Sequence, residues 1–172
     1  QKVQEVLRSV LPPDVIVAGD SSQVSYYGTV HFWPMEAPGR FLYPPGYATL
    51  GYGLPAGIGA KIGNPERPVI VLVGDGAFMF TAAELVTAAE QRLSIPVIVM
   101  NNHGYGEIGD QMDGRAIPRL AVDLTTPDFA ALGRACGAHG ERLTDLDGLA
   151  QAVQRALAAD GPTVIEVEVA AW

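Results

Sequence analysis

The stretch Val69-Ile-Val-Leu-Val-Gly-Asp-Gly76 decides the fold of this 172-residue chain. Its five apolar residues lie between Pro68 and Gly74, which is typical of a fully buried parallel strand. A second run of this kind, Pro96-Val-Ile-Val-Met100, follows a segment from Thr81 to Leu93 whose apolar residues recur at helical spacing. A strand, a helix and a strand in this order predict a right-handed crossover in a parallel sheet.

The same alternation continues on both sides of this unit. Further strands are predicted at 15–18 and 164–169, and further helices at 1–10, 51–62, 128–135 and 145–159. Thr126 is expected to cap the helix at 128–135, with Pro127 at its first position. The predicted fold is therefore a three-layer α/β/α sandwich with a mainly parallel, doubly wound sheet.

Composition excludes several classes of protein. Hydrophobic residues make up 48% of the chain, so a disordered protein is excluded. A net charge of −8 argues against a nucleic-acid partner or an anionic membrane surface. The single cysteine excludes an internal disulfide framework. No apolar run is long enough to span a bilayer and no signal peptide is visible, so we expect a cytoplasmic protein.

Two further features concern glycine content and the start of the chain. The 20 glycines concentrate between Gly39 and Gly114, which suggests backbone that approaches a ligand closely. The first residues already follow helical spacing, without an initiator Met or a cap. We expect residues 1–172 to be one domain, and a fragment of a larger multidomain chain.

Polar residues follow the two central strands directly. Asp75 comes after the first and Asn102 after the second, 27 positions later. One helix and one strand separate them, so both side chains belong to the same edge of the sheet, where ligands bind in such folds. Carboxylate and amide oxygens suit Mg²⁺ or Ca²⁺, and Mg²⁺ fills its shell with phosphate oxygens and water. The sequence thus predicts a metal and phosphate site at this edge.

This pair of segments resembles the thiamin diphosphate motif, which begins at Gly-Asp-Gly and ends at a double Asn. Gly74-Asp-Gly-Ala-Phe78 matches its start, and Val99-Met-Asn-Asn102 matches its end. Leu50-Gly-Tyr-Gly-Leu-Pro-Ala-Gly-Ile-Gly-Ala60 also resembles the glycine-rich segment of that family. Over essentially its whole length the chain is similar to the C-terminal, diphosphate-binding domain of the acetolactate synthase and benzoylformate decarboxylase group.

The resemblance implies roles for particular residues. Asp75 and Asn102 would ligate Mg²⁺ through their side chains and Gly104 through its carbonyl. Leu50 would hold the cofactor in a bent form, and the carbonyl of Ala48, where the family often has Gly, would accept from the cofactor's amino group. The remaining cofactor contacts implied by the resemblance are Gly19, Asp20, Ser21, Gly74, Gly76, Ala77 and Tyr105.

The reaction implied by the resemblance is attack of the cofactor's thiazolium carbon on a 2-oxo acid, followed by loss of CO₂. In the family, the glutamate that exchanges a proton with the cofactor belongs to a separate pyrimidine-binding domain. No segment here matches its context. We therefore expect half of an active site, with no catalytic residue of its own, that is inactive unless paired with that domain in a homodimer or homotetramer.

The segment from His103 to Thr125 has little periodicity, and loops of this length in compact domains are usually functional. In the family the corresponding segment shapes the substrate pocket. Candidate pocket residues are Tyr105, Glu107, Ile108, Gln111 and Met112, with Arg115 and Arg119 as candidates for attracting an anion. The Tyr105–Ile108 stretch resembles that of decarboxylases acting on guanidino-type 2-oxo acids, which favours a decarboxylase over a carboligase.

Two alternatives stay open from the sequence. Gly51-Tyr-Gly-Leu-Pro-Ala-Gly57 imitates the fingerprint of a dinucleotide-binding oxidoreductase, but it follows Pro44-Pro-Gly-Tyr47 rather than a strand. Because no strand precedes them, these glycines are expected to allow close helix packing rather than to bind a dinucleotide. The second alternative is a non-catalytic assembly domain, although such a domain has no need for the Asp75 and Asn102 pair.

Overall fold

The computed structural model describes residues 1–169 and confirms a three-layer α/β/α sandwich. Six strands form one sheet in the order β2-β1-β3-β4-β6-β5, and every pairing is parallel. The strands are β1 (Ile16–Gly19), β2 (Phe41–Leu42), β3 (Val69–Gly74), β4 (Pro96–Asn101), β5 (His139–Leu143) and β6 (Thr163–Glu168).

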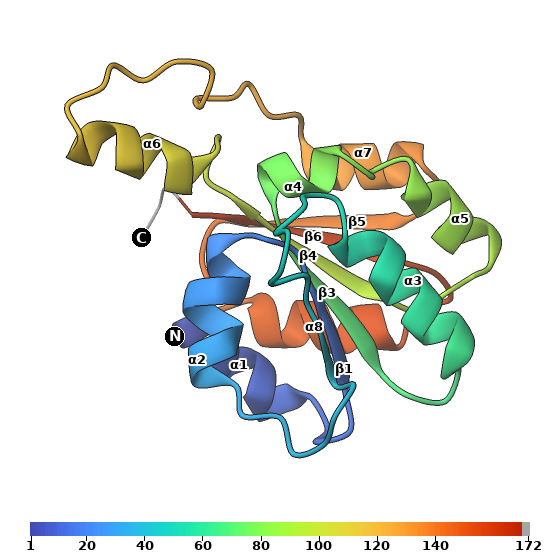
Figure 1. Ribbon diagram of the computed structural model, residues 1–172. Helices are drawn as coiled ribbons and strands as arrows, with labels where there is room; N and C mark the ends of the chain where they lie inside the picture. Colours follow the sequence, from blue (N-terminus) through green and yellow to red (C-terminus); the bar gives the residue numbers. More distant parts are fainter. Residues whose placement is uncertain (170–172) are drawn as a thin grey trace.

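Helices cover both faces of the sheet (Figure 1). One face carries α1 (Lys2–Val10) and α8 (Leu149–Leu157), which pack on strand residues such as Ile70, Leu72 and Ile98. The opposite face carries α3 (Gly53–Gly63), α4 (Asp75–Met79), α5 (Glu84–Glu90) and α7 (Phe129–Ala135), which pack on the alternate residues such as Val71, Val73 and Val97. Because both faces are covered, β3 and β4 are apolar throughout residues 69–73 and 96–100, as the continuous runs predicted.

Three elements lie at the carboxyl end of the sheet or beside it. A π-helix η1 (Val24–Thr29) runs into α2 (Val30–Phe32) after β1, and α6 (Gly106–Gly114) projects beyond the sheet after β4 (Figure 1). None of the three was predicted from the sequence. The expected loop at 103–125 is therefore wrong for residues 106–114, whose three glycines conceal a helix of weak periodicity. Within residues 1–169, no helix has the length and apolarity that crossing a bilayer requires.

Two predicted helices are shorter in the structure than the sequence suggested. The segment 81–93 was expected to form a helix, and within it α5 covers only Glu84–Glu90, after the separate short helix α4 that ends at Met79. Between them the Thr81 hydroxyl donates to the carbonyl of Gly51 at 3.2 Å, which ties this turn to the loop before α3. The helix predicted from Asp145 begins at Leu149.

The expected cap at Thr126 is also wrong. Asp128 is the N-cap of α7, and its carboxylate accepts from the backbone N–H of Ala131 at 2.7 Å. Thr126 lies two residues earlier and donates instead to the side-chain oxygen of Asn101 at 3.3 Å. Pro127 therefore precedes the helix rather than opening it.

Glycine allows α3 to lie close to the sheet. A side chain at Gly57 would overlap the Val71 methyl group on β3, and one at Gly53 would come within 2.9 Å of Val73 Cγ1. Gly53 and Gly57 thus serve helix packing, as expected from the sequence.

Candidate active site

Three loops meet at the carboxyl end of the sheet and enclose a cavity of about 310 Å³. They follow β1, β3 and β4. The register of the sheet pairs Gly74 with Met100, so Asp75 and Asn102 leave neighbouring strands side by side. The predicted site residues that line the cavity are Ser21, Leu50, Gly74, Asp75, Gly76, Ala77, Asn102, Gly104 and Tyr105. The sheet therefore brings together nine of the twelve candidates.

Three oxygen-bearing groups converge at one end of the cavity. One terminal atom of the Asn102 amide lies 2.9 Å from the Gly104 carbonyl oxygen and 3.1 Å from Asp75 Oδ1. With nitrogen in this place, the amide donates to both oxygens; with oxygen in this place, the Asn102 oxygen lies at these distances from two other acceptor oxygens. Neighbouring ligands of an octahedral Mg²⁺ lie ~3.0 Å apart, given metal–oxygen distances of ~2.1 Å. The donor set and its spacing therefore fit Mg²⁺.

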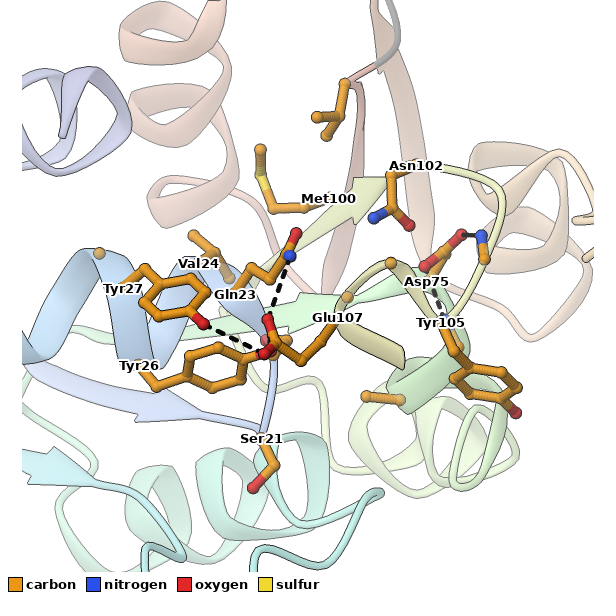
Figure 2. A pocket seen from close by; sticks show the side chains of 18 of the residues that line it. Ser21, Gln23, Val24, Tyr26, Tyr27, Asp75, Met100, Asn102, Tyr105 and Glu107 are labelled. Carbon is orange, nitrogen blue, oxygen red and sulfur yellow. Dashed lines mark hydrogen bonds between the residues drawn. The ribbon is translucent and has the colours of Figure 1, made fainter. Parts of the chain in front are cut away.

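The Asp75 carboxylate is held by the backbone on both sides (Figure 2). Oδ1 accepts from the N–H of Gly76 at 2.8 Å, and Oδ2 accepts from the N–H of Gly104 at 2.9 Å. The side chain is only 2% exposed, and this burial raises the pKa of Asp75 above its usual value, against the lowering effect of the two N–H donors. A buried carboxylate of this kind is stabilised by a bound cation.

A buried polar network fixes the loop that carries Asn102 and Gly104. The Asn101 amide donates to the buried carboxylate of Glu166 at 2.9 Å, and its oxygen accepts from the N–H of His103 at 3.2 Å. His103 has a positive φ of 58°, which is strained for a residue with a Cβ. Its ring contacts Thr126 Oγ1 at 2.7 Å and Glu168 Oε1 at 2.9 Å. These contacts fix His103, which lies between Asn102 and Gly104 in the sequence.

Three of the predicted cofactor contacts lie outside the cavity lining: Gly19, Asp20 and Ala48. Asp20 is 1% exposed, and its carboxylate accepts from the N–H groups of Gly51 at 3.1 Å and Gly53 at 2.9 Å, so it anchors the start of α3. Burial raises its pKa despite these donors. Gly19 ends β1 against the ring of Phe41, and Ala48 lies on an exposed loop with a φ of 54°. The contacts of Gly19 and Asp20 with a diphosphate, and of the Ala48 carbonyl with the cofactor's amino group, stay predictions.

Tyr105 and the glycine at position 76 are in contact. A Cβ at Gly76 would come within 2.6 Å of the Tyr105 ring, so the ring lies directly over this glycine. In Figure 2 the Tyr105 side chain extends to the opposite side from Tyr26 and Tyr27. Tyr105 therefore supports the wall around Asp75 instead of reaching across the cavity.

A second cluster of polar side chains lies in the cavity, and of its members only Glu107 was predicted from the sequence. Glu107, from the first turn of α6, meets Tyr26 and Tyr27 of η1 and Gln23 just before it (Figure 2). Its Oε1 accepts from the Tyr27 hydroxyl at 3.1 Å and from Gln111 Nε2 at 2.9 Å. These hydrogen bonds, that from Gln111 first, hold the pKa of Glu107 below its usual value. Burial and the Glu107 charge raise the pKa of Tyr26 far above its usual value.

The other candidates from the segment 103–125 divide into two groups. Ile108 lines the cavity together with Glu107, whereas Gln111, Met112, Arg115 and Arg119 do not. Arg119 is paired with Asp113 at 2.7 Å and with Asp123 at 3.1 Å, so it is engaged within its own segment. The sequence signal that could have found Tyr26 and Tyr27 was their position within ten residues of the end of β1, at the edge where ligands bind.

Known proteins that are similar to this chain in sequence include thiamin diphosphate-dependent enzymes. The profile of the family described as "Thiamine pyrophosphate enzyme, C-terminal TPP binding domain" matches residues 20–167; thiamine pyrophosphate and thiamin diphosphate are the same compound. The "Probable 2-ketoarginine decarboxylase AruI" of Pseudomonas aeruginosa is 45% identical over 97% of this chain, and acetolactate synthase isozyme 2 large subunit of Escherichia coli is 30% identical over 92%.

A solved structure supports the same assignment. The thiamine diphosphate-dependent 4-hydroxybenzoylformate decarboxylase of Rhodococcus jostii RHA1 superimposes over 97% of this chain with a TM-score of 0.88 and 30% identity. The chain spans 30% and 29% of the two curated relatives and 32% of this structure. A dinucleotide-binding fold is thereby set aside. The chain belongs to the family of C-terminal thiamin diphosphate-binding domains of thiamin diphosphate-dependent enzymes.

Proposed function

We propose that this chain supplies the magnesium- and diphosphate-binding half of the active site of a 2-oxo acid decarboxylase or an acetolactate synthase-like carboligase. The observation that carries the proposal is the convergence of Asp75 Oδ1, the Asn102 amide and the Gly104 carbonyl at one end of the cavity. When bound there, thiamin diphosphate supplies a thiazolium carbon that adds to a 2-oxo acid and accepts the electron pair left by CO₂.

The residues of the chain have separate tasks in this proposal. Asp75, Asn102 and the Gly104 carbonyl would bind Mg²⁺, and Gly76 and Ala77 would place their backbone beside the diphosphate. Leu50 would support the cofactor in its bent form from the opposite wall. Both Leu50 and Ala77 line the cavity, which supports these assignments.

The second half of the site would come from a pyrimidine-binding domain, on the same polypeptide or on a partner subunit, in a homodimer or homotetramer. The share of the relatives that this chain spans, about 30%, leaves room for such a domain. By itself the chain would bind the cofactor without turning it over. Turnover of any 2-oxo acid by the purified 172-residue chain would contradict this division of labour.

Among the two reactions, decarboxylation is favoured. The relative with "2-ketoarginine decarboxylase" in its name is 45% identical, against 30% for the acetolactate synthase subunit. The alternative of a non-catalytic assembly domain predicts no binding of Mg²⁺ with thiamin diphosphate.

Thermal unfolding of the chain with and without thiamin diphosphate and Mg²⁺ tests the proposal. At a ligand concentration of about 100 Kd, binding adds ~2.7 kcal/mol, or a rise of roughly 5–10 °C in Tm for a domain of this size. Asp75→Asn should abolish the rise, and the exposed Asp147→Asn should keep it. A rise with NAD or NADP instead, or a full rise in Asp75→Asn, would overturn the proposal.

A further inference from the structure

The Glu107 carboxylate faces the cavity with one oxygen poorly satisfied. Oε1 has two donors, at 2.9 and 3.1 Å, but the donors nearest to Oε2, Tyr26 Oη and Gln23 Nε2, both lie at 3.5 Å. An ionised carboxylate oxygen accepts more and shorter hydrogen bonds than these. Oε2 therefore has capacity for another donor from within the cavity.

No positive side chain of the described residues balances this charge. Among the side chains that line the cavity, Asp75 and Glu107 are acidic and none is a Lys, Arg or His. Asp75 belongs to the proposed Mg²⁺ site, which supplies its own cation. Glu107 takes part in none of the ion pairs among residues 1–169, and Arg119, on the same segment, is bound to Asp113 and Asp123. A carboxylate without a counter-ion in a cavity attracts a cationic ligand.

The donors around Glu107 are neutral and fixed. Tyr26 and Tyr27 contact each other edge to face, with ring centroids 4.7 Å apart, on a π-helix that packs beside the cavity. Gln111 first, and then these tyrosines, donate to the Glu107 carboxylate and hold its pKa below its usual value. Val24 and the half-exposed Ile108 add apolar surface on either side, which suits a hydrocarbon chain.

We infer that Glu107 is a specificity-determining residue that recognises a guanidinium or ammonium group at the far end of a 2-oxo acid substrate. The inference rests on the proposed function, because the 2-oxo group must react at the cofactor. A guanidinium group would donate to Oε2, with its alkyl chain lying along Ile108 and Val24. A neutral aliphatic 2-oxo acid would leave the carboxylate without its partner and would be a poorer substrate.

The experiment uses the assembled enzyme, in which this chain works with its pyrimidine-binding domain. The variants are Glu107→Gln, Glu107→Asp and the control Glu66→Gln, which lies before β3 at the other end of the sheet. The substrates are 5-guanidino-2-oxopentanoate and the neutral 2-oxohexanoate. Thiamin diphosphate affinity in the presence of Mg²⁺ is measured for each variant, together with its Tm.

In the wild-type enzyme we expect a higher kcat/KM for the guanidino substrate. Glu107→Gln should lower that value by about 10- to 100-fold, the range for one charge-assisted hydrogen bond, with 2-oxohexanoate and cofactor affinity changed less than twofold. Glu107→Asp, which keeps the charge, should retain part of the preference, and Glu66→Gln should retain all of it.

Three results would overturn the inference. The first is a wild-type enzyme without preference for the cationic substrate. The second is an equal loss of activity on both substrates in Glu107→Gln. The third is a loss of cofactor affinity in Glu107→Gln, which would assign the carboxylate to the positively charged ring of the cofactor. If the wild-type enzyme binds no thiamin diphosphate, the proposed function fails, and this inference fails with it.

Discussion

Replacing Glu166 by glutamine changes one oxygen of a buried carboxylate into an amide nitrogen. Glu166 is 1% exposed on β6, where Oε1 accepts from Asn101 Nδ2 at 2.9 Å and Oε2 accepts from the N–H of Phe129 at 3.0 Å. Both partners are donors, so a glutamine can satisfy one and must turn its own N–H₂ toward the other. The shape of the side chain is nearly unchanged, and the loss is therefore one of hydrogen bonding and charge.

The loss of stability in Glu166→Gln can be estimated from the one hydrogen bond that glutamine cannot make. A hydrogen bond to a charged group contributes ~1.5–3 kcal/mol, and a buried donor left without an acceptor costs a similar amount. The weaker attraction of Arg142, whose Nε lies 3.7 Å from Oε1, is lost as well. We expect Glu166→Gln to lower the free energy of unfolding by ~2–3 kcal/mol, which corresponds to roughly 5–10 °C in Tm.

Equilibrium unfolding in urea measures this change. The matched control is Glu141→Gln on the neighbouring strand β5, whose carboxylate is paired with the exposed side chain of Arg155. An exposed pair of this kind contributes at most ~1 kcal/mol. A second measurement is Mg²⁺ affinity with thiamin diphosphate, which should fall several-fold in Glu166→Gln because Asn101 also holds His103 between Asn102 and Gly104, two of the proposed Mg²⁺ ligands. A Glu166→Gln variant within 0.5 kcal/mol of the control would refute this account of the network.

Three further predictions concern packing, capping and pH. Gly57→Ala should destabilise the fold by ~1–3 kcal/mol because its methyl group overlaps Val71, whereas Gly59→Ala on the same helix has open space and should stabilise it by up to ~1 kcal/mol; thermal unfolding of the pair decides. Asp128→Ala removes the N-cap of α7 and should cost ~1 kcal/mol in urea unfolding, and an unchanged midpoint would exclude the cap. The pKa of Glu107 is lowered in the folded state, so its contribution to stability is present above its ordinary value of 4.5 and lost as the pH falls through the folded value. The stability difference between wild type and Glu107→Gln should narrow on acidification, and a difference that widens would contradict the lowered pKa.

The central layers could be predicted from the sequence because their signals are strong and local. The short apolar runs at 69–73 and 96–100, rich in β-branched residues and bounded by turn-forming residues, favour buried strands, and the register of those strands brings Asp75 beside Asn102. The proximity of Asp75 and Asn102 therefore followed from the order of strands and helices alone.

The elements that were missed have weak local signals. β5 contains Glu141 and Arg142 and lies at the edge of the sheet, so its residues are not uniformly apolar. In α6 three glycines oppose helix formation, and in η1 the polar and aromatic residues serve the cavity rather than a core. The Glu107 group depends on contacts across 80 or more positions, such as the hydrogen bond between Tyr27 and Glu107, which no local pattern contains.

The three loops of the cavity come from chain segments that are far apart, around residues 21–28, 74–77 and 100–108. A molecule that binds all three loops acts as a reversible cross-link, because a loop can open only when it gives up its contacts with that molecule. Its free energy of binding is then added to the local opening of each loop, by RT ln(1 + [L]/Kd). Among these segments, α6 projects farthest from the sheet (Figure 1), and its resistance to limited proteolysis would report whether the cofactor is bound.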